Sequence, residues 1–174
     1  MIVGIGHRSC IMLIVVGCLA ALAACAGGRV TDGVYRDAGN RYTLRLPAGA
    51  WLPQPLEGAV VAFRAPSLRA GLGLAVECER PEPGELRHVA RHLFWGLTNR
   101  QIRESGPVSL RGAVGRRSRL VGRLDGQRVE AEGVTVRHGG CLYDFVYVAP
   151  PEAFERGRAD FEAFLAGFTP LAGP

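Results

Sequence analysis

Apolar and polar residues alternate over several short stretches of the chain, as at Tyr42, Leu44 and Leu46. A period of two residues is typical of a strand with one buried face. The alternation predicts strands over residues 41–47, 59–64, 71–79, 101–105, 108–111 and 141–148. Proline and glycine separate these stretches, so we expect short strands that follow one another in an antiparallel sheet.

A hairpin is predicted around Asp125-Gly126, a dipeptide that favours a two-residue turn. Its strands would span 116–124 and 127–136. This register places Leu120 opposite Ala131 on the inner face. On the outer face Arg119 would lie opposite Glu132 as a pair of opposite charges.

Two other stretches repeat apolar residues every three or four positions, which predicts amphipathic helices. The first stripe consists of Leu86, Val89, Ala90, Leu93, Phe94 and Leu97, and the second of Phe161, Phe164, Leu165 and Phe168. The second helix is expected over 160–168. A sheet in meander order with one helix in mid-chain and one at the end indicates an α+β fold, an antiparallel β-sheet flanked by helices.

The chain begins with an apolar run that ends in Leu22-Ala23-Ala24-Cys25. A short positive start, an apolar core and small residues at its end are typical of a secretory signal. The last four residues resemble the lipobox of bacterial lipoproteins, in which the cysteine receives a diacylglycerol and further acyl chains such as palmitate. An uncleaved signal-anchor helix ranks second and ordinary cleavage at an Ala-x-Ala-like site third.

This interpretation divides the chain into a signal peptide over 1–24, a lipidated tether over 25–37 and one folded domain over 38–170. Two or three acyl chains would hold the domain durably at a membrane, whereas one chain holds a protein only marginally. Ala26 is not the aspartate that favours retention in the inner membrane of enteric bacteria. By that analogy the outer membrane, facing the periplasm, is favoured over the inner membrane.

The number and placement of the basic residues limit the classes of partner that the protein can bind. All 21 basic residues are arginine, and the formal net charge is +5. The excess is mild and scattered, so it predicts no nucleic-acid binding. Five arginines gather on the predicted hairpin: Arg116, Arg117, Arg119, Arg123 and Arg128. We interpret them as a solvated strand face balanced by Glu130 and Glu132, with docking to an acidic lipid or partner as the alternative.

Two cysteines remain once the signal is removed and Cys25 is lipidated. Cys78 and Cys141 each lie on the apolar face of a predicted strand. In an oxidising envelope they could form a disulfide. Two buried free thiols are the alternative that the sequence leaves open.

The order of elements resembles that of the PsbP-like superfamily, which includes bacterial DcrB-type lipoproteins. The matching pieces are Tyr42-Thr-Leu-Arg-Leu-Pro47 followed by Trp51, the helix from Leu86, Val108-Ser-Leu-Arg-Gly112, Leu142-Tyr-Asp-Phe-Val-Tyr-Val148, and the ending from Phe161 to Phe168. The resemblance implies an α/β/α sandwich and a binding or assembly role without catalysis. It supplies no shared catalytic residue.

Few residues are candidates for metal binding or for contact with a partner. His88 and His92 are four positions apart on the first predicted helix, but position 89 is Val instead of the Glu of a zinc peptidase and no third ligand is evident. We therefore expect no metal and no cofactor. With Trp95 the two histidines lie on the side of the helix away from the apolar stripe. They form a candidate partner patch, although coverage of that helix side by the tether or a loop is the favoured interpretation.

No nucleophile elbow, Cys-x-x-Cys pair or phosphate loop is present in the sequence, so we expect no enzyme. The favoured interpretation is an envelope lipoprotein whose domain binds or assembles with an envelope protein. The alternative is a carrier of a small apolar ligand. A carrier requires a deep cavity lined by Leu86, Leu93, Phe145 and Phe164.

Overall fold

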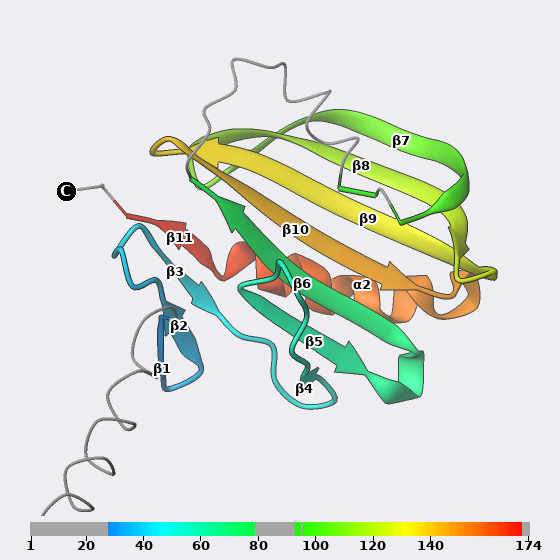
Figure 1. Ribbon diagram of the computed structural model, residues 1–174, viewed down its shortest axis with the longest axis horizontal. Coiled ribbons are helices and arrows are strands. Elements are labelled where there is room, and N and C mark those ends of the chain that lie inside the picture. Colours follow the sequence, from blue (N-terminus) through cyan, green and yellow to red (C-terminus); the bar gives the residue numbers. More distant parts are fainter. Residues whose placement is uncertain (1–27, 79–92, 95, 172–174) are drawn as a thin grey trace, which may run out of the picture.

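The structure is a computed structural model that describes residues 28–78, 93–94 and 96–171 (Figure 1). These residues form two antiparallel sheets and a long helix. The smaller sheet has the order β1 (Arg29–Thr31), β2 (Val34–Arg36), β3 (Tyr42–Arg45) and β11 (Phe168–Pro170). The larger has the order β4 (Leu52–Pro53), β5 (Val61–Ala65), β6 (Ala70–Glu77), β10 (Cys141–Ala149), β9 (Gln127–His138), β8 (Ala113–Leu124) and β7 (Thr98–Leu110). A 3₁₀ turn, η1 (Pro66–Leu68), joins β5 to β6.

The helix α2 (Pro151–Ala166) covers one face of the larger sheet and contacts β6, β9 and β10. Aromatic side chains fill the space between them. Phe145 on β10 packs edge-to-face against Phe164 at 5.9 Å, and Tyr147 stacks on Phe161 at 5.7 Å between ring centroids. Such pairs stabilise a core beyond the apolar area that they bury.

The helix is longer than the expected 160–168. It begins at Pro151, because proline suits the first helical position, where its missing N–H costs no hydrogen bond. Glycine is unfavourable inside a helix, but position 157 requires it because a Cβ there would lie 2.5 Å from the Tyr147 hydroxyl oxygen. Phe161, Phe164 and Leu165 are buried as expected, whereas Phe168 lies in β11.

The chain re-enters the fold as β11, directly after α2, and pairs with β3. This connection places the smaller sheet beside α2 on the same face of the larger sheet. Tyr42 of β3 packs edge-to-face on Tyr143 of β10 at 5.2 Å, and Phe168 lies 4.9 Å from Tyr143. One continuous core therefore joins both sheets and the helix.

The expected α/β/α sandwich is wrong for this chain. The structure is mainly β, and the layer over one face of the larger sheet combines α2 with a second sheet. Residues 29–36, expected in the tether, supply two strands of that sheet. Asp32 and Gly33 both have positive φ and form the two-residue turn that joins β1 to β2.

The helix expected from Leu86 lies mostly outside the described residues. Its described end is not helical: Leu93, Phe94 and Gly96 form turns, and the Leu97 amide donates to the Phe94 carbonyl. Phe94 and Leu97 pack on Leu120 and Ala131, on the face of the larger sheet opposite α2.

The hairpin register is confirmed, with Leu120 opposite Ala131 and Gly122 opposite Val129. The two short strands expected on either side of Gly106-Pro107 are one strand, β7, which forms the edge of the larger sheet. Pro107 is tolerated there because an edge strand leaves alternate N–H positions without a ladder partner.

Candidate functional site

A layer of charged side chains lies between the hairpin and α2. Glu132 of β9 is 1 % exposed. Its carboxylate accepts hydrogen bonds from Arg117 Nε at 2.5 Å and from Arg158 Nε of α2 at 3.1 Å. Arg117 also pairs with Glu162 of the helix. Both partners of the buried carboxylate are thus guanidinium groups fixed by a strand and a helix.

Arg119 occupies the next position along the same layer. Its guanidinium donates to Glu130 and to Glu155 of α2, both at 2.6 Å, and lies 4.6 Å above the Phe154 ring. Burial lowers the pKa of Arg119, but the hydrogen bonds to Glu130 and Glu155 outweigh it and raise the pKa overall. The arginine stays charged, so the layer works as a set of ion pairs that hold α2 on the sheet.

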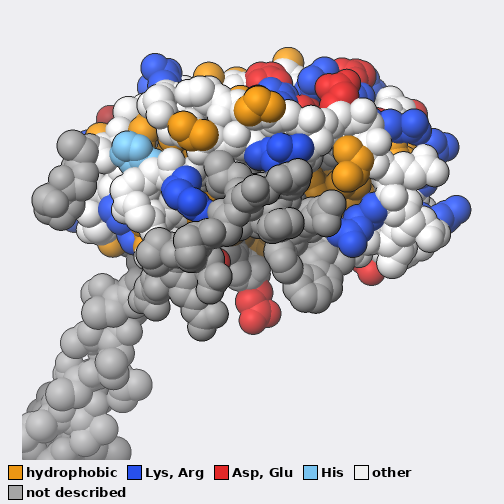
Figure 2. Space-filling view, turned by 90° about the horizontal axis from the view of Figure 1, so that it is seen from above, with side chains coloured by type: hydrophobic (Ala, Val, Ile, Leu, Met, Phe, Trp, Pro, Cys, Tyr) orange, Lys and Arg blue, Asp and Glu red, His pale blue; other side chains and the backbone are white. Residues whose placement is uncertain are grey.

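The interpretation of this hairpin as a solvated strand face is wrong for Arg117, Arg119 and Glu132. In the folded protein α2 packs over that face, a contact that the periodicity of the hairpin cannot reveal. Arg116 projects from the opposite face and donates to Ser105 at 3.0 Å. Arg123 and Arg128 lie opposite each other at the exposed end. Figure 2 shows basic side chains spread over the visible surface instead of gathered in one patch.

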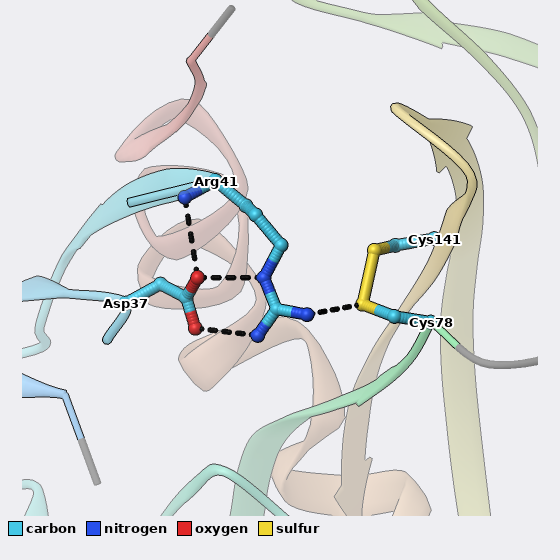
Figure 3. Close-up of a disulfide and its surroundings, with 4 residues drawn as sticks. All are labelled: Asp37, Arg41, Cys78 and Cys141. Atoms are coloured by element: carbon cyan, nitrogen blue, oxygen red, sulfur yellow. Dashed lines mark hydrogen bonds and ion pairs between the residues drawn. A yellow bond between two sulfur atoms is a disulfide. The ribbon is translucent and has the colours of Figure 1, made fainter. Parts of the chain in front are cut away.

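Cys78 and Cys141 form a disulfide, so the structure contains the first of the two alternatives that the sequence left open. The bond joins the end of β6 to the start of β10 (Figure 3). Arg41, which precedes β3, donates to the Cys78 sulfur at 2.7 Å. The disulfide thereby lies where the smaller sheet meets the larger one.

Asp37 holds Arg41 in this position. Its carboxylate accepts from Arg41 Nε at 2.7 Å and from Nη2 at 2.9 Å, a bidentate pair (Figure 3). These hydrogen bonds lower the pKa of Asp37 below its ordinary value. Nearby, the Tyr42 hydroxyl is buried without a hydrogen-bond partner among the described residues, and burial raises its pKa.

A partly buried carboxyl lies on the face of the larger sheet opposite α2. Asp144 of β10 accepts from the Thr135 hydroxyl at 2.6 Å. Burial raises the pKa of Asp144, and the hydrogen bond from Thr135 offsets part of that effect. The negative charge of Glu77, on the neighbouring strand β6, raises the pKa of Asp144 further.

The candidate partner patch of His88, His92 and Trp95 falls outside the described residues, as does Cys25. Within the described ranges, no three His, Cys, Asp or Glu side chains are grouped closely enough to hold a metal ion. No described helix combines the length and apolar character needed to cross a bilayer.

Of the four residues expected to line a carrier cavity, Leu86 lies outside the described residues, and the other three do not share one face of the larger sheet. Phe145 and Phe164 are packed against each other on the α2 face. Leu93 lies on the other face, where it contacts the Gly133 position. A hollow of about 150 Å³ does exist beside Trp51, whose indole N–H donates to Asp160 at 3.0 Å. A cavity of about this volume holds a ligand the size of benzene, which is much smaller than an acyl chain.

One surface was missed by the sequence reasoning because it lies mostly in the expected tether. The outward positions of the smaller sheet carry Arg29, Arg36 and Arg45, all exposed. Val34, Tyr35 and Arg36 alternate between half-buried, buried and exposed, the period that marks a strand. A three-residue strand is too short for that signal to stand out.

Comparison with known proteins identifies the fold. No family model and no curated protein matches the chain. Among solved structures, cyanobacterial PsbP from Synechocystis sp. PCC 6803 matches with a TM-score of 0.61 at 15% identity, over 86% of this chain and 99% of that protein.

LpqN, described as involved in cell envelope biogenesis of Mycobacterium tuberculosis, matches with a TM-score of 0.57 at 12% identity, over 76% and 85% of the two chains. A protein of unknown function from Pseudomonas aeruginosa matches with a TM-score of 0.55 at 11% identity, over 71% and 99%. Identities this low establish the fold alone. The chain therefore has a PsbP-like fold.

Proposed function

We propose that the protein is a lipoprotein of the bacterial cell envelope whose single domain binds or assembles with another envelope protein. The observation that carries the proposal is the disulfide between Cys78 and Cys141. Disulfides persist in oxidising compartments and are rare in the cytosol. A disulfide inside the folded domain supports the export that the signal-like start of the chain predicts.

The lipid anchor rests on the sequence. Leu22-Ala23-Ala24-Cys25 precedes the first described strand by only a few residues. Cleavage and lipidation at Cys25 would leave the domain joined to the bilayer by a short linker. The similarity in fold to LpqN, a protein involved in cell envelope biogenesis, supports the same compartment.

A binding role is supported by how the polar groups are used. Glu132, Arg117 and Arg119 all hold the helix on the sheet, and Asp37 holds Arg41. Among the described residues these groups serve packing, since each is bound to an oppositely charged side chain of a neighbouring element or turn. The carrier alternative loses its support because Phe145 and Leu93 lie on opposite faces of the larger sheet.

Intact-mass analysis of the protein from native membranes tests the anchor. The expected mass corresponds to a chain that begins at Cys25 and carries acyl chains. A Cys25→Ala variant should lose labelling by a palmitate analogue. Cys18→Ala is the matched control, since Cys18 lies inside the signal and its loss should leave labelling intact. A mass that includes residues 1–24, or a free thiol at Cys25, would overturn the anchor.

Crosslinking in intact cells tests the binding role. The native chain should give reproducible crosslinks to an envelope protein, and Trp95→Ala should weaken them if the expected patch is the docking site. Far-UV circular dichroism must show that the variant is folded. Crosslinks unchanged by the substitution would exclude that patch as the docking site. Reproducible turnover of a substrate by the purified chain would contradict the non-catalytic role.

A further inference from the structure

We propose that the outer face of the smaller sheet binds the headgroups of anionic phospholipids. The proposal deepens the proposed function, since the lipid anchor would bring this face to a membrane. The face consists of the outward positions of β1, β2, β3 and β11 and is called the basic face below. Its members are Arg29, Thr31, Val34, Arg36, Thr43, Arg45 and Thr169.

The two sides of the smaller sheet differ sharply. The inner side carries Tyr35, Tyr42 and Leu44, which are 7 %, 0 % and 0 % exposed and pack into the core. Strand geometry sends alternate side chains to opposite faces, so the residues between them point away from the protein. The three arginines of the basic face are accordingly exposed.

The arginines lie close together. Arg29 is directly opposite Arg36 in the β1–β2 ladder. Arg45 is opposite Val34, which makes it the diagonal neighbour of Arg36 on the same face. Like charges directly opposite each other destabilise a sheet. Such a pair is accommodated best when an anion binds between the two guanidinium groups.

The acidic residues nearest in sequence do not neutralise this pair. Asp37 faces the other way and is bound to Arg41 in a bidentate pair. Asp32 lies in the turn at the far end of the hairpin from Arg29. Arg36 donates to Asn40 at 2.8 Å, but an amide brings no negative charge.

The position of the basic face in the chain identifies a membrane as its partner. Gly28 follows Cys25 by three residues, which span at most about 10 Å when extended. The Gly28 amide donates to the Tyr35 hydroxyl at 3.1 Å and so fixes where the chain leaves the sheet. An anchored Cys25 would therefore place β1 and β2 near the headgroups.

The chemistry of the face favours phosphate over a protein surface. A guanidinium binds phosphate oxygens with two parallel hydrogen bonds. The remaining members of the basic face are threonines and one valine, and none is the aromatic anchor that dominates most protein interfaces. Each arginine near an anionic membrane surface strengthens binding by about fivefold.

Hydrogen exchange in nanodiscs tests the proposal. The full chain as purified from cells is mixed with discs of phosphatidylcholine alone or with about 30% phosphatidylglycerol, the fraction of anionic lipid being chosen to give a marked surface charge. We expect the amides of residues 29–36 to exchange at least about threefold more slowly in the anionic discs than in the neutral ones. The difference should vanish in about 0.5 M NaCl, because salt at that concentration screens charges that are more than a few ångströms apart.

Arg29→Glu/Arg36→Glu should abolish the slowing, while exchange in β10 shows that the variant is folded. Arg103→Glu/Arg128→Glu is the matched control, because it makes the same charge change on exposed arginines of β7 and β9. Equal exchange in both kinds of disc overturns the proposal, as does an equal loss in both variants. The mass of the purified chain reports separately whether the anchor is present, so the two failures are distinguishable.

Discussion

Arg119 and Glu132 stand directly opposite each other in the β8–β9 ladder, yet each is bonded to a different partner. Arg119 pairs with Glu130, while Glu132 accepts from Arg117 and from Arg158 of the helix. The charged face of the hairpin is thereby tied to α2, and its most buried member is a carboxylate. Removing that carboxylate should be costly.

We expect Glu132→Ala to lower the free energy of unfolding by about 3 kcal/mol, because breaking a buried ion pair leaves its partner charges uncompensated. Urea unfolding at pH 7 measures the change. Glu162→Ala removes a half-exposed carboxylate from the same layer and should cost less than about 1 kcal/mol. Equal losses in the two variants would show that the covered layer does not hold the helix.

Loss of the disulfide should destabilise the fold strongly. Cys78 and Cys141 are separated by 63 residues. A crosslink closing such a loop contributes on the order of 4 kcal/mol in the chain-entropy model. Cys78→Ala/Cys141→Ala should lower the urea midpoint accordingly, and the wild-type chain unfolded in reductant should give the same midpoint. A midpoint that does not move in either case would contradict this role.

The pair of Asp37 with Arg41 should make stability depend on pH in acid. Arg41 lowers the pKa of Asp37 in the folded state, so the unfolded state binds more protons in that range. The stabilisation is present above about pH 4, the pKa of an unfolded aspartate, and is lost as the pH falls through the lower folded value. Asp37→Asn should flatten this acid limb in a series of urea titrations.

The control for that series is Asp32→Asn. Asp32 lies in the β1–β2 turn with φ +49°, a conformation that asparagine also adopts readily. This variant should keep the acid limb of the wild type. If both variants lose it, the pH dependence comes from net charge and the bidentate pair is not its source.

Asp144 should act in the opposite sense. Burial raises its pKa in the folded state, so its contribution to stability is fully present below about pH 4 and is lost as the pH rises through the folded value. Asp144→Asn removes the ionisable group and with it this loss of stability at higher pH. The stability of the variant relative to wild type should rise as the pH increases above about 4, the ordinary pKa of an aspartate, and level off once the pH has passed the raised folded pKa. A difference that is constant with pH would argue that Asp144 is not perturbed.

Gly133 should be required for the packing of residues 93–94 on the larger sheet. A Cβ at this position would lie 2.2 Å from Leu93 Cδ2 and 2.7 Å from Phe94 Cζ. We expect Gly133→Ala to cost about 1–3 kcal/mol, because it overfills a packed contact. Gly106→Ala, in β7, meets no atom within 4 Å and serves as the control. Thermal unfolding of the two variants distinguishes them.

Much of the local structure was determined by the sequence itself. The Asp125-Gly126 turn and the alternation on either side of it predicted the β8–β9 register residue by residue. The apolar stripe of Phe161, Phe164 and Leu165 predicted the buried side of α2. These features follow from backbone stereochemistry and from the spacing of side chains along one element, both of which the sequence contains directly.

Tertiary structure decided which faces are covered. The alternation around Arg119 and Glu132 shows that the hairpin has a charged face, but only the position of α2, starting 19 residues after Glu132, makes it a buried one. In the same way Arg29 and Arg36 belong to a sheet because β3 and β11 pair beside them. Such contacts join residues far apart in the chain, and periodicity reports only neighbours along it.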